Sequence, residues 1–399
     1  MNPAYLVDGI RTPIGNFGGS LSSVRTDDLA AIVLNELLKR NSSLDPAAIE
    51  DVILGCANQA GEDNRNVARM ASLLAQIPVS VPGQTVNRLC ASGLCAAMDA
   101  SRVIMTGEAE IMVAGGVENM TRGPWVMSKA STPYGRDQQL FDTSFGWRFI
   151  NPKMKEIYGV DAMGETAENL AELYKISRED QDQFAYWSQK KAFDSSKLVH
   201  EEIVPVSITQ KKGDTLIFDK DEFSKPATTL ENLSKLKPAF RKDGSVTAGN
   251  SSGLNDGAAA LLLSSEAGLK KYHLNPLARI VSAAAAGVEP KIMGIGPVEA
   301  ANKALKRAGL NWDQIDLIEL NEAFAAQALS CIRLWHLEDR DARINPNGGA
   351  IALGHPLGMS GARILLTAAL ELKRRNKKFA LITMCIGVGQ GYAVIIEKI

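Results

Sequence analysis

The chain has 399 residues, of which 45% are apolar and 22% are charged. This composition excludes a mainly disordered protein, and the length predicts two or three domains or one duplicated unit. Lys and Arg number 44 against 45 Asp and Glu, so a nucleic-acid-binding function is not expected. No uninterrupted apolar run reaches the roughly 18–20 residues of a membrane helix, and the first residues do not resemble a signal peptide. The five scattered cysteines predict neither a disulfide framework nor a zinc site, so we expect a cytoplasmic protein without membrane association.

Short apolar strands and amphipathic helices alternate over the first 120 residues. Strands are predicted at Ala4–Val7, Val52–Leu54 and Ile111–Ala114. A helix is predicted at Asp27–Arg40 and another at Ala91–Met105. Alternating strands and helices are typical of buried sheets with substantial parallel character.

Charged and polar residues interrupt this alternation between residues 121 and 250. Helices are predicted at Glu165–Tyr174 and Arg178–Lys191, the second beginning at Ser177 with Asp180 in its first turn. Structureless stretches of this length are rare in compact domains, so we interpret these residues as an inserted subdomain.

The last third of the sequence repeats features of the first third. The segment Leu44–Leu54 is similar to Leu310–Leu320, and Ser92-Gly93 is similar to Ser360-Gly361 at nearly the same offset. Strands at Leu317–Leu320 and Ala380–Met384 and a helix at Pro297–Ala308 complete this part. We therefore expect two similar α/β halves: 1–120 with 251–273, and 274–399, with the insert at 121–250.

Four reactive groups are predicted at or just beyond strand ends, where α/β folds bind their ligands. Cys90 precedes a helix, whose dipole favours a thiolate and whose N–H groups can stabilise an oxyanion. His355 lies in a glycine-rich turn and could take the thiol proton. Asn321 and Cys385 each follow a predicted strand. The alternative for Cys90 alone is a small buried hydrophobe, as expected for most cysteines.

These motifs resemble those of the thiolases, the acyl-CoA:acetyl-CoA C-acyltransferases. The resemblance extends from Arg11-Thr12-Pro13 to Cys385-Ile386-Gly387, with Asn-Glu-Ala-Phe and Gly-His-Pro between them in family order. It implies an α/β thiolase fold of two βαβαβαββ halves in five layers, αβαβα, with the insert as a CoA-binding loop domain. It also implies a homotetramer or homodimer that takes CoA and acyl-CoA as substrates, without a metal or a permanently bound cofactor.

The resemblance implies a ping-pong cleavage of a 3-oxoacyl-CoA by CoA. Cys90 would be the nucleophile, His355 its base and Cys385 the acid and base for the acetyl carbon. His355 with a water held by Asn321 would form one oxyanion hole, and the N–H groups of Cys90 and Gly387 the other. The positions that match the family's CoA contacts are Lys225 for a phosphate and Met163, Leu236, Phe240, Ala248, Ser252, Leu254, Ala323 and Phe324 for the adenine and pantetheine path; the alternative for the lining residues is plain core packing.

Several stretches are similar to the branch of the family that cleaves 3-oxoadipyl-CoA to succinyl-CoA and acetyl-CoA in aromatic-acid catabolism. They are Gly55–Asn66, Gly146–Phe149, Asn345–Gly349 and Cys385–Gly391. Ala162 stands where acetoacetyl-CoA thiolases carry His, which counts against an enzyme dedicated to acetoacetyl-CoA. Asn119 and Cys95 differ from the oxoadipyl pattern and weaken the likeness to that branch. Arg65 and Arg148 lie in these stretches and are candidates to bind an acyl carboxylate; the alternative is structural salt bridges.

Other functions remain open on the sequence alone. The chain could be a general 3-ketoacyl-CoA or acetoacetyl-CoA thiolase. A decarboxylating condensing enzyme shares the fold but pairs its cysteine with two histidines or with histidine and asparagine, and Cys385 favours a thiolase. A non-catalytic acyl-CoA-binding scaffold is the remaining alternative.

Overall fold

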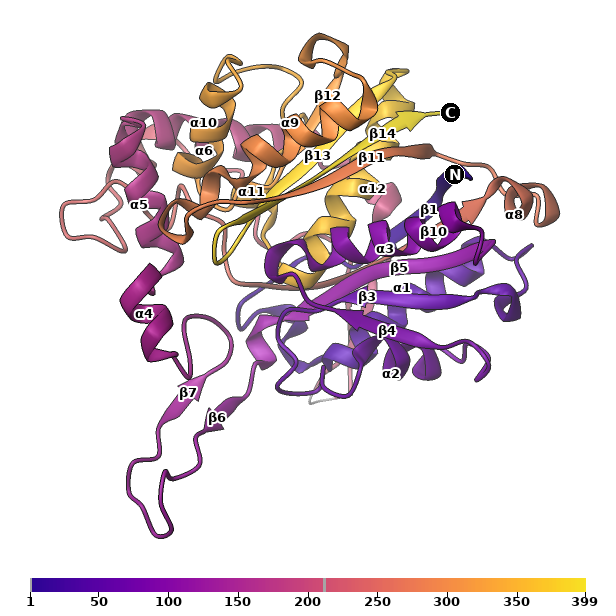
Figure 1. Cartoon of the computed structure of the whole chain (residues 1–399), viewed down its shortest axis with the longest axis horizontal. Helices are drawn as coiled ribbons and strands as arrows, with labels where there is room; N and C mark the ends of the chain where they lie inside the picture. The colour runs from indigo at the N-terminus through magenta and orange to yellow at the C-terminus, as the bar shows by residue number, and fades with distance from the viewer. Residues whose placement is uncertain (1, 211–212) are drawn as a thin grey trace.

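Helical layers and β-sheets alternate through the molecule in the order αβαβα (Figure 1). The computed structural model describes residues 2–210 and 213–399. The helices of the three helical layers are α3 (Ser92–Thr106) and α12 (Leu357–Arg375) in the centre, α1 (Thr26–Arg40) and α2 (Val67–Leu74) on one outer face, and α9 (Gly296–Ala308) and α10 (Ala325–Leu334) on the other. One buried apolar cluster joins the central helices to both sheets, and two more join each sheet to its outer helices. This arrangement confirms the predicted fold class.

The sheet of the first half contains both parallel and antiparallel strand pairs. Its strands, in spatial order, are β4 (Gly83–Val86), β3 (Asp51–Gly55), β5 (Ile111–Asn119), β10 (Asn255–Ser265) and β1 (Ala4–Arg11). Strand β3 runs parallel to β4 and β5, whereas β10 runs antiparallel to β5 and β1. The short strand β2 (Gly15–Asn16) also pairs with β10. Parallel pairing is therefore confined to one side of the sheet.

The sheet of the second half repeats this pattern. Its strands, in spatial order, are β12 (Leu317–Leu320), β13 (Phe379–Ile386), β14 (Gln390–Lys398) and β11 (Ala278–Gly287). Strand β12 is parallel to β13, and the remaining pairs are antiparallel. A parallel bridge between Ile318 and Ile344 stands where the first half has β4. The two sheets meet at two residue pairs between β1 and β11. The predicted duplication is thus confirmed strand by strand.

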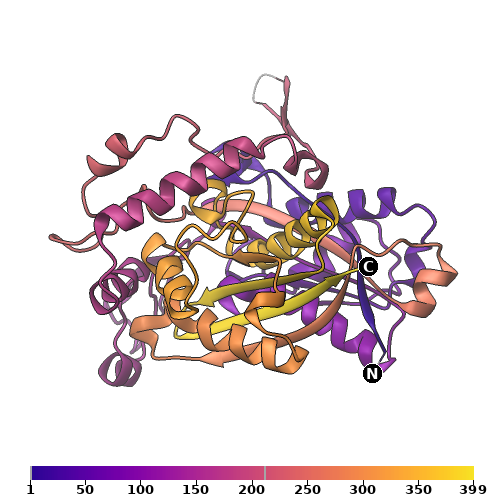
Figure 2. The same cartoon turned by 90° about the horizontal axis from the view of Figure 1, so that it is seen from above.

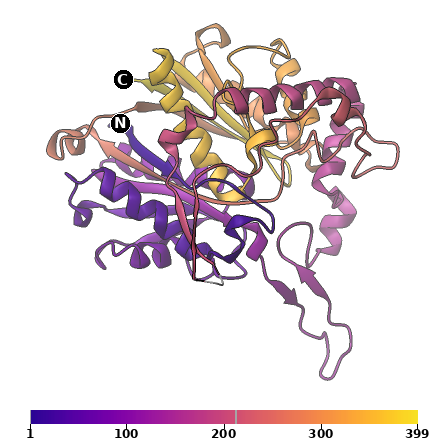
Figure 3. The same cartoon turned by 180° about the vertical axis from the view of Figure 1, so that it is seen from behind.

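The insert enters the first half between β5 and β10. The second half joins the equivalent strands, β13 and β14, by a tight turn at residues 387–389. The elements of the insert are β6 (Trp125–Met127), β7 (Leu140–Asp142), α4 (Pro152–Tyr158), α5 (Met163–Leu173), α6 (Arg178–Asp194), β8 (Val206–Thr209), β9 (Thr215–Phe218) and α7 (Leu230–Ser234). Helix α6 begins with the predicted cap, in which Ser177 and Asp180 bond reciprocally, and it lies over the second half (Figure 2). The β6–β7 hairpin projects from the body (Figure 3).

The remaining elements are short helices. Two of them are α-helices, α8 (Glu266–Lys271) and α11 (Ala350–Leu353). The 3-10 helices are Ser20–Ser23, Pro46–Ala48, Leu89–Ala91, Met120–Arg122, Val199–Glu202, Pro290–Ile295 and Trp312–Gln314.

The two central helices approach each other closely at their N-terminal ends. A Cβ atom on Gly93 would lie 2.4 Å from the carbonyl oxygen of Gly358, and one on Gly361 would lie 2.4 Å from the backbone nitrogen of Leu94. Only glycine permits such contacts between backbones. The starts of α3 and α12, and the turns that precede them, are therefore held side by side.

The window Leu89–Thr106 is long and apolar enough, by length and composition alone, to cross a membrane. The window contains no uninterrupted apolar run of membrane-spanning length, because Ser92, Asp99, Ser101 and Arg102 interrupt it. In the fold this segment contains α3, which is packed between the two sheets.

Candidate active site

Cys90 lies in the 3-10 turn that leads from β4 into α3. Leu89 adopts a φ of 47°, a conformation that non-glycine residues rarely adopt. Side chains on both sides hold this turn: Asn87 accepts from the N–H of Leu89 at 2.8 Å, and the Ser92 hydroxyl donates to the Leu89 carbonyl at 2.7 Å. Strained backbone held in this way is characteristic of functional sites. Cys90 is half-buried as a residue, and its thiol group faces the interior.

The Cys90 thiol is protonated in the resting site. Burial raises its pKa to about 11, although the N–H groups of Gly387 and of Cys90 itself act in the opposite direction. Backbone N–H groups therefore favour the thiolate of Cys90, but burial outweighs them. Cys90 must lose its proton to a base as it attacks.

His355 lies in the turn between α11 and α12. Its backbone N–H donates to the side-chain oxygen of Asn255 at 2.9 Å. The preceding Gly354 has a φ of 101°, and a Cβ atom there would lie 2.7 Å from the Asn255 side chain. Glycine is thus required to seat this turn against β10. In this way a strand of the first half positions a residue of the second.

The two ring nitrogens of His355 have different partners. Nδ1 lies 2.6 Å from the Ser360 hydroxyl, whose own proton is donated to the Pro356 carbonyl at 2.8 Å. Nδ1 must then carry the ring proton. Nε2 lies 3.3 Å from the side-chain nitrogen of Asn321, an amide donor, so Nε2 is an acceptor. Burial and the charge of Arg363 lower the pKa of His355 to about 3, which keeps the ring neutral. In the resting site Nε2 therefore carries no proton and accepts from Asn321.

Cys385 lies at the end of β13, fully buried. Burial and the nearby Cys90 raise the pKa of the Cys385 thiol well above its usual value, so this group is also protonated. Two residues further on, a Cβ atom on Gly387 would lie 3.2 Å from the side chain of Leu89 and 3.8 Å from Met163. The tight β13–β14 turn thus brings a backbone N–H donor and a second thiol to Cys90.

The structure brings most of the predicted CoA-path residues together beside Cys385. Ala323 and Phe324 share a buried apolar cluster with it, and the ring of Phe240 meets Phe324 edge-on at 6.2 Å. Phe240 also packs on Gly164, next to Met163. The N–H of Ser252 bonds to the carbonyl of Ala323 at 3.0 Å. These residues therefore form a wall of contacting side chains beside Cys385.

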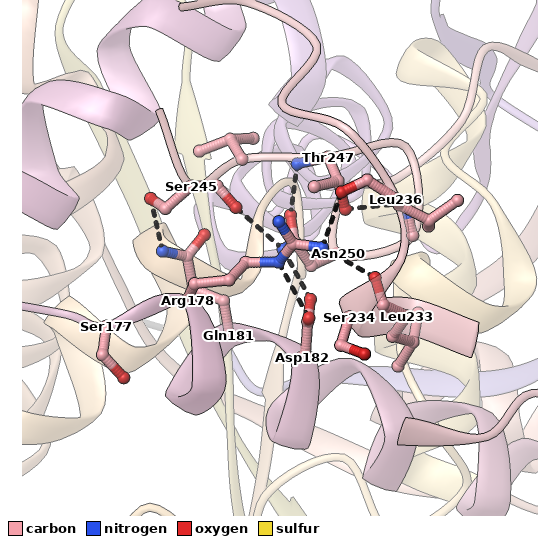
Figure 4. A network of polar contacts seen from close by, with 12 residues as sticks. Ser177, Arg178, Gln181, Asp182, Leu233, Ser234, Leu236, Ser245, Thr247 and Asn250 are labelled. Carbon is pink, nitrogen blue, oxygen red and sulfur yellow. Dashed lines mark hydrogen bonds and ion pairs between the residues drawn. The ribbon is translucent and has the colours of Figure 1, made fainter. Parts of the chain in front are cut away.

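A polar network in the insert supports the outer part of this wall (Figure 4). Arg178 on α6 donates to Asp182 and to the carbonyls of Leu233 and Leu236 at 2.6–2.9 Å. Asn250 donates to the same Asp182 at 2.9 Å. One helix thereby fixes the segments on either side of the exposed Ala248.

Three predicted binding residues have few contacts of their own. Lys225 is exposed, with its ammonium 5.3 Å from the centre of the Phe223 ring, and Phe223 packs on Gly253, next to Leu254. Arg65 is exposed. Arg148 is half-buried and donates weakly to the Thr143 carbonyl at 3.5 Å. Across the described residues 2–210 and 213–399, neither arginine forms an ion pair.

Glu118 is a positioning residue that the sequence analysis missed. It is buried at the end of β5 and accepts three backbone N–H groups, from Ala57, Asn58 and Gly358, each at 2.9 Å. One carboxylate thus joins the loop after β3 to the turn that carries His355. An acidic residue at the end of a wholly apolar strand was the available signal, because a buried carboxylate needs several partners.

Glu118 also belongs to a buried group with Cys56 and Asp63, whose ligand atoms lie within 4.8 Å of one another. Hydrogen bonds already occupy these atoms: Asp63 accepts from the N–H of Gly61, and the Cys56 thiol donates to the Asn58 carbonyl at 2.9 Å. Burial and Glu118 raise the pKa of the Cys56 thiol well above its usual value. These hydrogen bonds account for the group as part of the structure that joins the loop after β3 to β5.

Comparisons with known proteins agree with this geometry. Residues 4–267 match the family model "Thiolase, N-terminal domain" and residues 274–398 match "Thiolase, C-terminal domain". The chain is 59% identical to the 3-oxoadipyl-CoA/3-oxo-5,6-dehydrosuberyl-CoA thiolase of Escherichia coli and 56% identical to a beta-ketoadipyl-CoA thiolase of Acinetobacter baylyi, in each case over 100% of both chains. The crystal structure of the Bacillus anthracis acetyl-CoA acetyltransferase is similar with a TM-score of 0.92 and 42% identity, over 100% of this chain and 99% of that one.

Proposed function

Because the chain belongs to the thiolase family, it is an acyltransferase, and we propose that it cleaves 3-oxoadipyl-CoA with CoA to succinyl-CoA and acetyl-CoA. The observation that carries this proposal is the identity of 56–59%, over the full length of both chains, to relatives named for this substrate. The two neighbouring thiols of Cys90 and Cys385, with the neutral imidazole of His355 on the turn that precedes α12, support it chemically.

In the first stage, Nε2 of His355 takes the proton of the Cys90 thiol while the sulfur attacks the 3-keto carbon. The bond between C2 and C3 then breaks, and its electron pair leaves on the α-carbon of acetyl-CoA. Cys385 donates its proton to that carbon. Acetyl-CoA departs and the acyl group remains as a thioester on Cys90.

In the second stage, the Cys385 thiolate takes the proton of an incoming CoA thiol. The CoA thiolate attacks the thioester carbonyl, and Cys90 leaves with the proton held on His355. The acyl-CoA product departs and both thiols are restored. Splitting the reaction replaces one difficult step with two easier ones.

Negative charge develops on an oxygen in both stages. The N–H groups of Cys90 and Gly387 both lower the pKa of the Cys90 thiol, and such donors near the sulfur would stabilise the oxygen of a carbonyl bound to it. His355 Nε2 and a water held by Asn321 would receive the other oxyanion, as in the family that the sequence resembles. Loss of one such donor costs about 3–4 kcal/mol in the barrier.

A second candidate is a thiolase for neutral short chains. Its support is the likeness to the Bacillus anthracis acetyl-CoA acetyltransferase at 42% identity. Thiolysis rates with acetoacetyl-CoA, 3-oxohexanoyl-CoA and 3-oxoadipyl-CoA separate the two. The proposal expects the highest kcat/KM with 3-oxoadipyl-CoA, and an equal or higher value with 3-oxohexanoyl-CoA would overturn it.

We also propose that the protein is a homotetramer or homodimer of cytoplasmic location, without a permanently bound cofactor. The projecting β6–β7 hairpin supports self-association, because Trp125, Met127 and Leu140 are exposed by 60–71% on it. Exposed apolar patches of this kind are typical of interaction surfaces. Light scattering on the wild type and on Trp125→Asp tests this, and a wild-type monomer would contradict it.

A further inference from the structure

Glu322 follows Asn321 directly in the chain, and its side chain joins three separate segments. The carboxyl group is buried and accepts from the Ser188 hydroxyl on α6 at 2.6 Å, from the Asn345 side-chain amide at 2.7 Å and from the Ile351 N–H in α11 at 3.2 Å. All three partners donate, so the group serves as an acceptor, as an ionised carboxylate does. A buried carboxylate therefore links the loop after β12 to the insert and to α11.

The first link fixes the backbone around Asn321. The Asn345 side chain accepts from the N–H of Leu320 and donates to the carbonyl of the same residue, each at 2.8 Å, and it also donates to Glu322. Leu320 is the last residue of β12 and immediately precedes Asn321. The N–H of Asn321 itself donates to the Thr383 carbonyl on β13 at 3.0 Å. Asn321 is thus held through its own backbone and through both of its neighbours.

The second link fixes the segment that carries His355. Besides the bond from Ile351 to Glu322, the Ser188 hydroxyl accepts from the Gly349 N–H at 3.1 Å. A Cβ atom on Gly349 would lie 2.2 Å from the carboxyl carbon of Glu322, so the backbone approaches the carboxylate as only glycine permits. Helix α11 ends two residues before His355. The carboxylate that holds one side of Asn321 therefore also holds the start of the His355 turn.

Helix α6 contributes to the charge balance of this contact. Burial raises the pKa of Glu322, whereas the bonds from Ser188 and Asn345 and the ammonium of Lys191 act in the opposite direction. Lys191 lies one turn after Ser188 on α6 and donates to the Ile344 carbonyl at 2.9 Å. The insert thus supplies a hydroxyl and a cation to a carboxylate of the second half.

We propose that Glu322 is a positioning residue that sets the placement of Asn321 relative to His355, and with it the oxyanion hole that these two side chains complete around a water. The side-chain nitrogen of Asn321 lies 3.3 Å from Nε2 of His355. The segments that carry these two groups are both bonded to the Glu322 carboxylate, so a change of its bonds shifts them relative to each other. An error of about 1 Å in the placement of a catalytic group can cost a factor of ~100 in rate. This inference rests on the proposed function, in which that oxyanion hole acts.

The test is Glu322→Gln, which keeps the volume of the side chain but replaces one acceptor oxygen with a donor that faces another donor. We expect kcat for thiolysis to fall about 10–100-fold, with KM for CoA nearly constant. Glu202→Gln is the matched control, because Glu202 is equally buried but accepts from Arg11 and Thr367 instead. It should lower the free energy of unfolding and leave kcat unchanged. An unchanged kcat in Glu322→Gln, or an equal loss in Glu202→Gln, overturns the assignment.

A double-mutant cycle distinguishes positioning from a general loss of structure. In Asn321→Ala the group to be positioned is absent, so the addition of Glu322→Gln should lower kcat by less than about threefold. Equal losses in the presence and absence of the Asn321 side chain would show that Glu322 acts independently, and would overturn the proposal.

Ser188→Ala weakens the same link more gently and keeps the proposal testable if Glu322→Gln does not fold. It removes one donor to Glu322, and we expect kcat to fall about 3–10-fold where the Asn321 side chain is present. Ser72→Ala is its control, because this equally buried hydroxyl bonds to the Ala68 carbonyl within α2 and should be dispensable for activity. Equal kcat in the two serine variants would overturn the proposal.

Each loss is measured with 3-oxoadipyl-CoA and with acetoacetyl-CoA, so that this inference and the proposed function can fail separately. The same fold-loss is expected for both, because the oxyanion hole serves the part of the substrate that they share. If the wild type does not prefer 3-oxoadipyl-CoA, the proposed substrate fails, while a loss in Glu322→Gln that depends on Asn321 still supports the positioning role. If the losses are independent of Asn321 with both substrates, the role of Glu322 fails and the proposed substrate stands.

Discussion

The Nδ1 atom of His355 lies 2.6 Å from the Ser360 hydroxyl, which donates its own proton one turn back to the Pro356 carbonyl. The start of α12 therefore decides which nitrogen of the imidazole carries the proton. Because that proton is on Nδ1, Nε2 is left as the acceptor that faces Asn321. The first turn of α12 therefore selects the His355 tautomer whose Nε2 carries no proton.

Removal of the Ser360 hydroxyl should slow the chemistry without weakening substrate binding. In Ser360→Ala the buried Nδ1–H loses its partner, which costs about 1–3 kcal/mol, so we expect kcat to fall about 10–100-fold with KM nearly constant. Steady-state thiolysis measures this. Ser330→Ala is the control, because Ser330 is equally buried and bonds only to the Ala326 carbonyl. Equal activity of both variants would contradict the role of Ser360.

Cys90→Ser should fold but form no acyl-enzyme, because the hydroxyl is a far weaker nucleophile than the thiol. Mass spectrometry after incubation with acetyl-CoA measures the adduct. Cys95→Ala, one helical turn further on, should retain the adduct, since the Cys95 thiol is buried and directed at Asp99. An adduct on Cys385 or Cys95 in the wild type would refute the assignment of the nucleophile.

Cys385→Ala should separate the two proton transfers. His355 and Cys90 remain, so acylation by acetyl-CoA should persist. Exchange of the α-protons of acetyl-CoA with deuterated water should be lost, because no other thiol faces that carbon in the proposed mechanism. Cys331→Ala, also a buried thiol of the second half, should keep both activities. Exchange at the wild-type rate in Cys385→Ala would show that another group moves the proton.

The buried carboxyl of Glu319 should make stability depend on pH. Burial raises its pKa to about 8, from an ordinary value of 4.5. The folded state then holds a proton that the unfolded state releases between these values, so the free energy of unfolding falls as pH rises from 5 to 8, by up to roughly 1.4 kcal/mol per pH unit. Glu319→Gln lacks this contribution.

Urea unfolding of the wild type and Glu319→Gln at pH 5, 6, 7 and 8 tests this. The difference between the two proteins isolates Glu319, because Glu118 and Asp256, whose pKa values are also raised by burial, remain in both. We expect the variant to gain stability relative to the wild type as pH rises. Parallel pH profiles would show that Glu319 does not hold a proton in this range.

Val388 occupies a backbone conformation that suits glycine. Its φ of 63° is costly for a β-branched residue, by about 1–2 kcal/mol, part of which glycine would lose again through its freer unfolded chain. We expect Val388→Gly to raise the free energy of unfolding measured in urea by roughly 0.5–1 kcal/mol. Lys175→Gly, with a φ of 53° on an exposed turn, should stabilise similarly.

The elements near reactive groups could be predicted from sequence because their signals are local. Strand β12 has the predicted bounds, Leu317–Leu320, and α1 differs from the predicted helix by one residue. Strand β10 was not predicted. All of its residues are buried, so the alternation that identifies a half-exposed strand is absent, and its run of Ala and Leu suits a helix equally.

The contacts that assemble the site could not be predicted, because they join distant parts of the chain. Asn255 seats the turn of His355, and Glu118 reaches Gly358 across the two halves. The pKa of Cys90 was also out of reach, since the opposing effects of burial and of backbone N–H groups depend on the packed structure. The sequence therefore predicts which residues are reactive, whereas their protonation states depend on the folded structure.

The two halves differ at the connection between their last two strands, and this difference breaks the symmetry of the duplicated scaffold. The second half closes that connection with the three-residue turn at 387–389, whereas the first opens it into the insert. The duplicated scaffold therefore carries a covering subdomain at one of these connections and a tight turn at the other, so its two halves are not interchangeable.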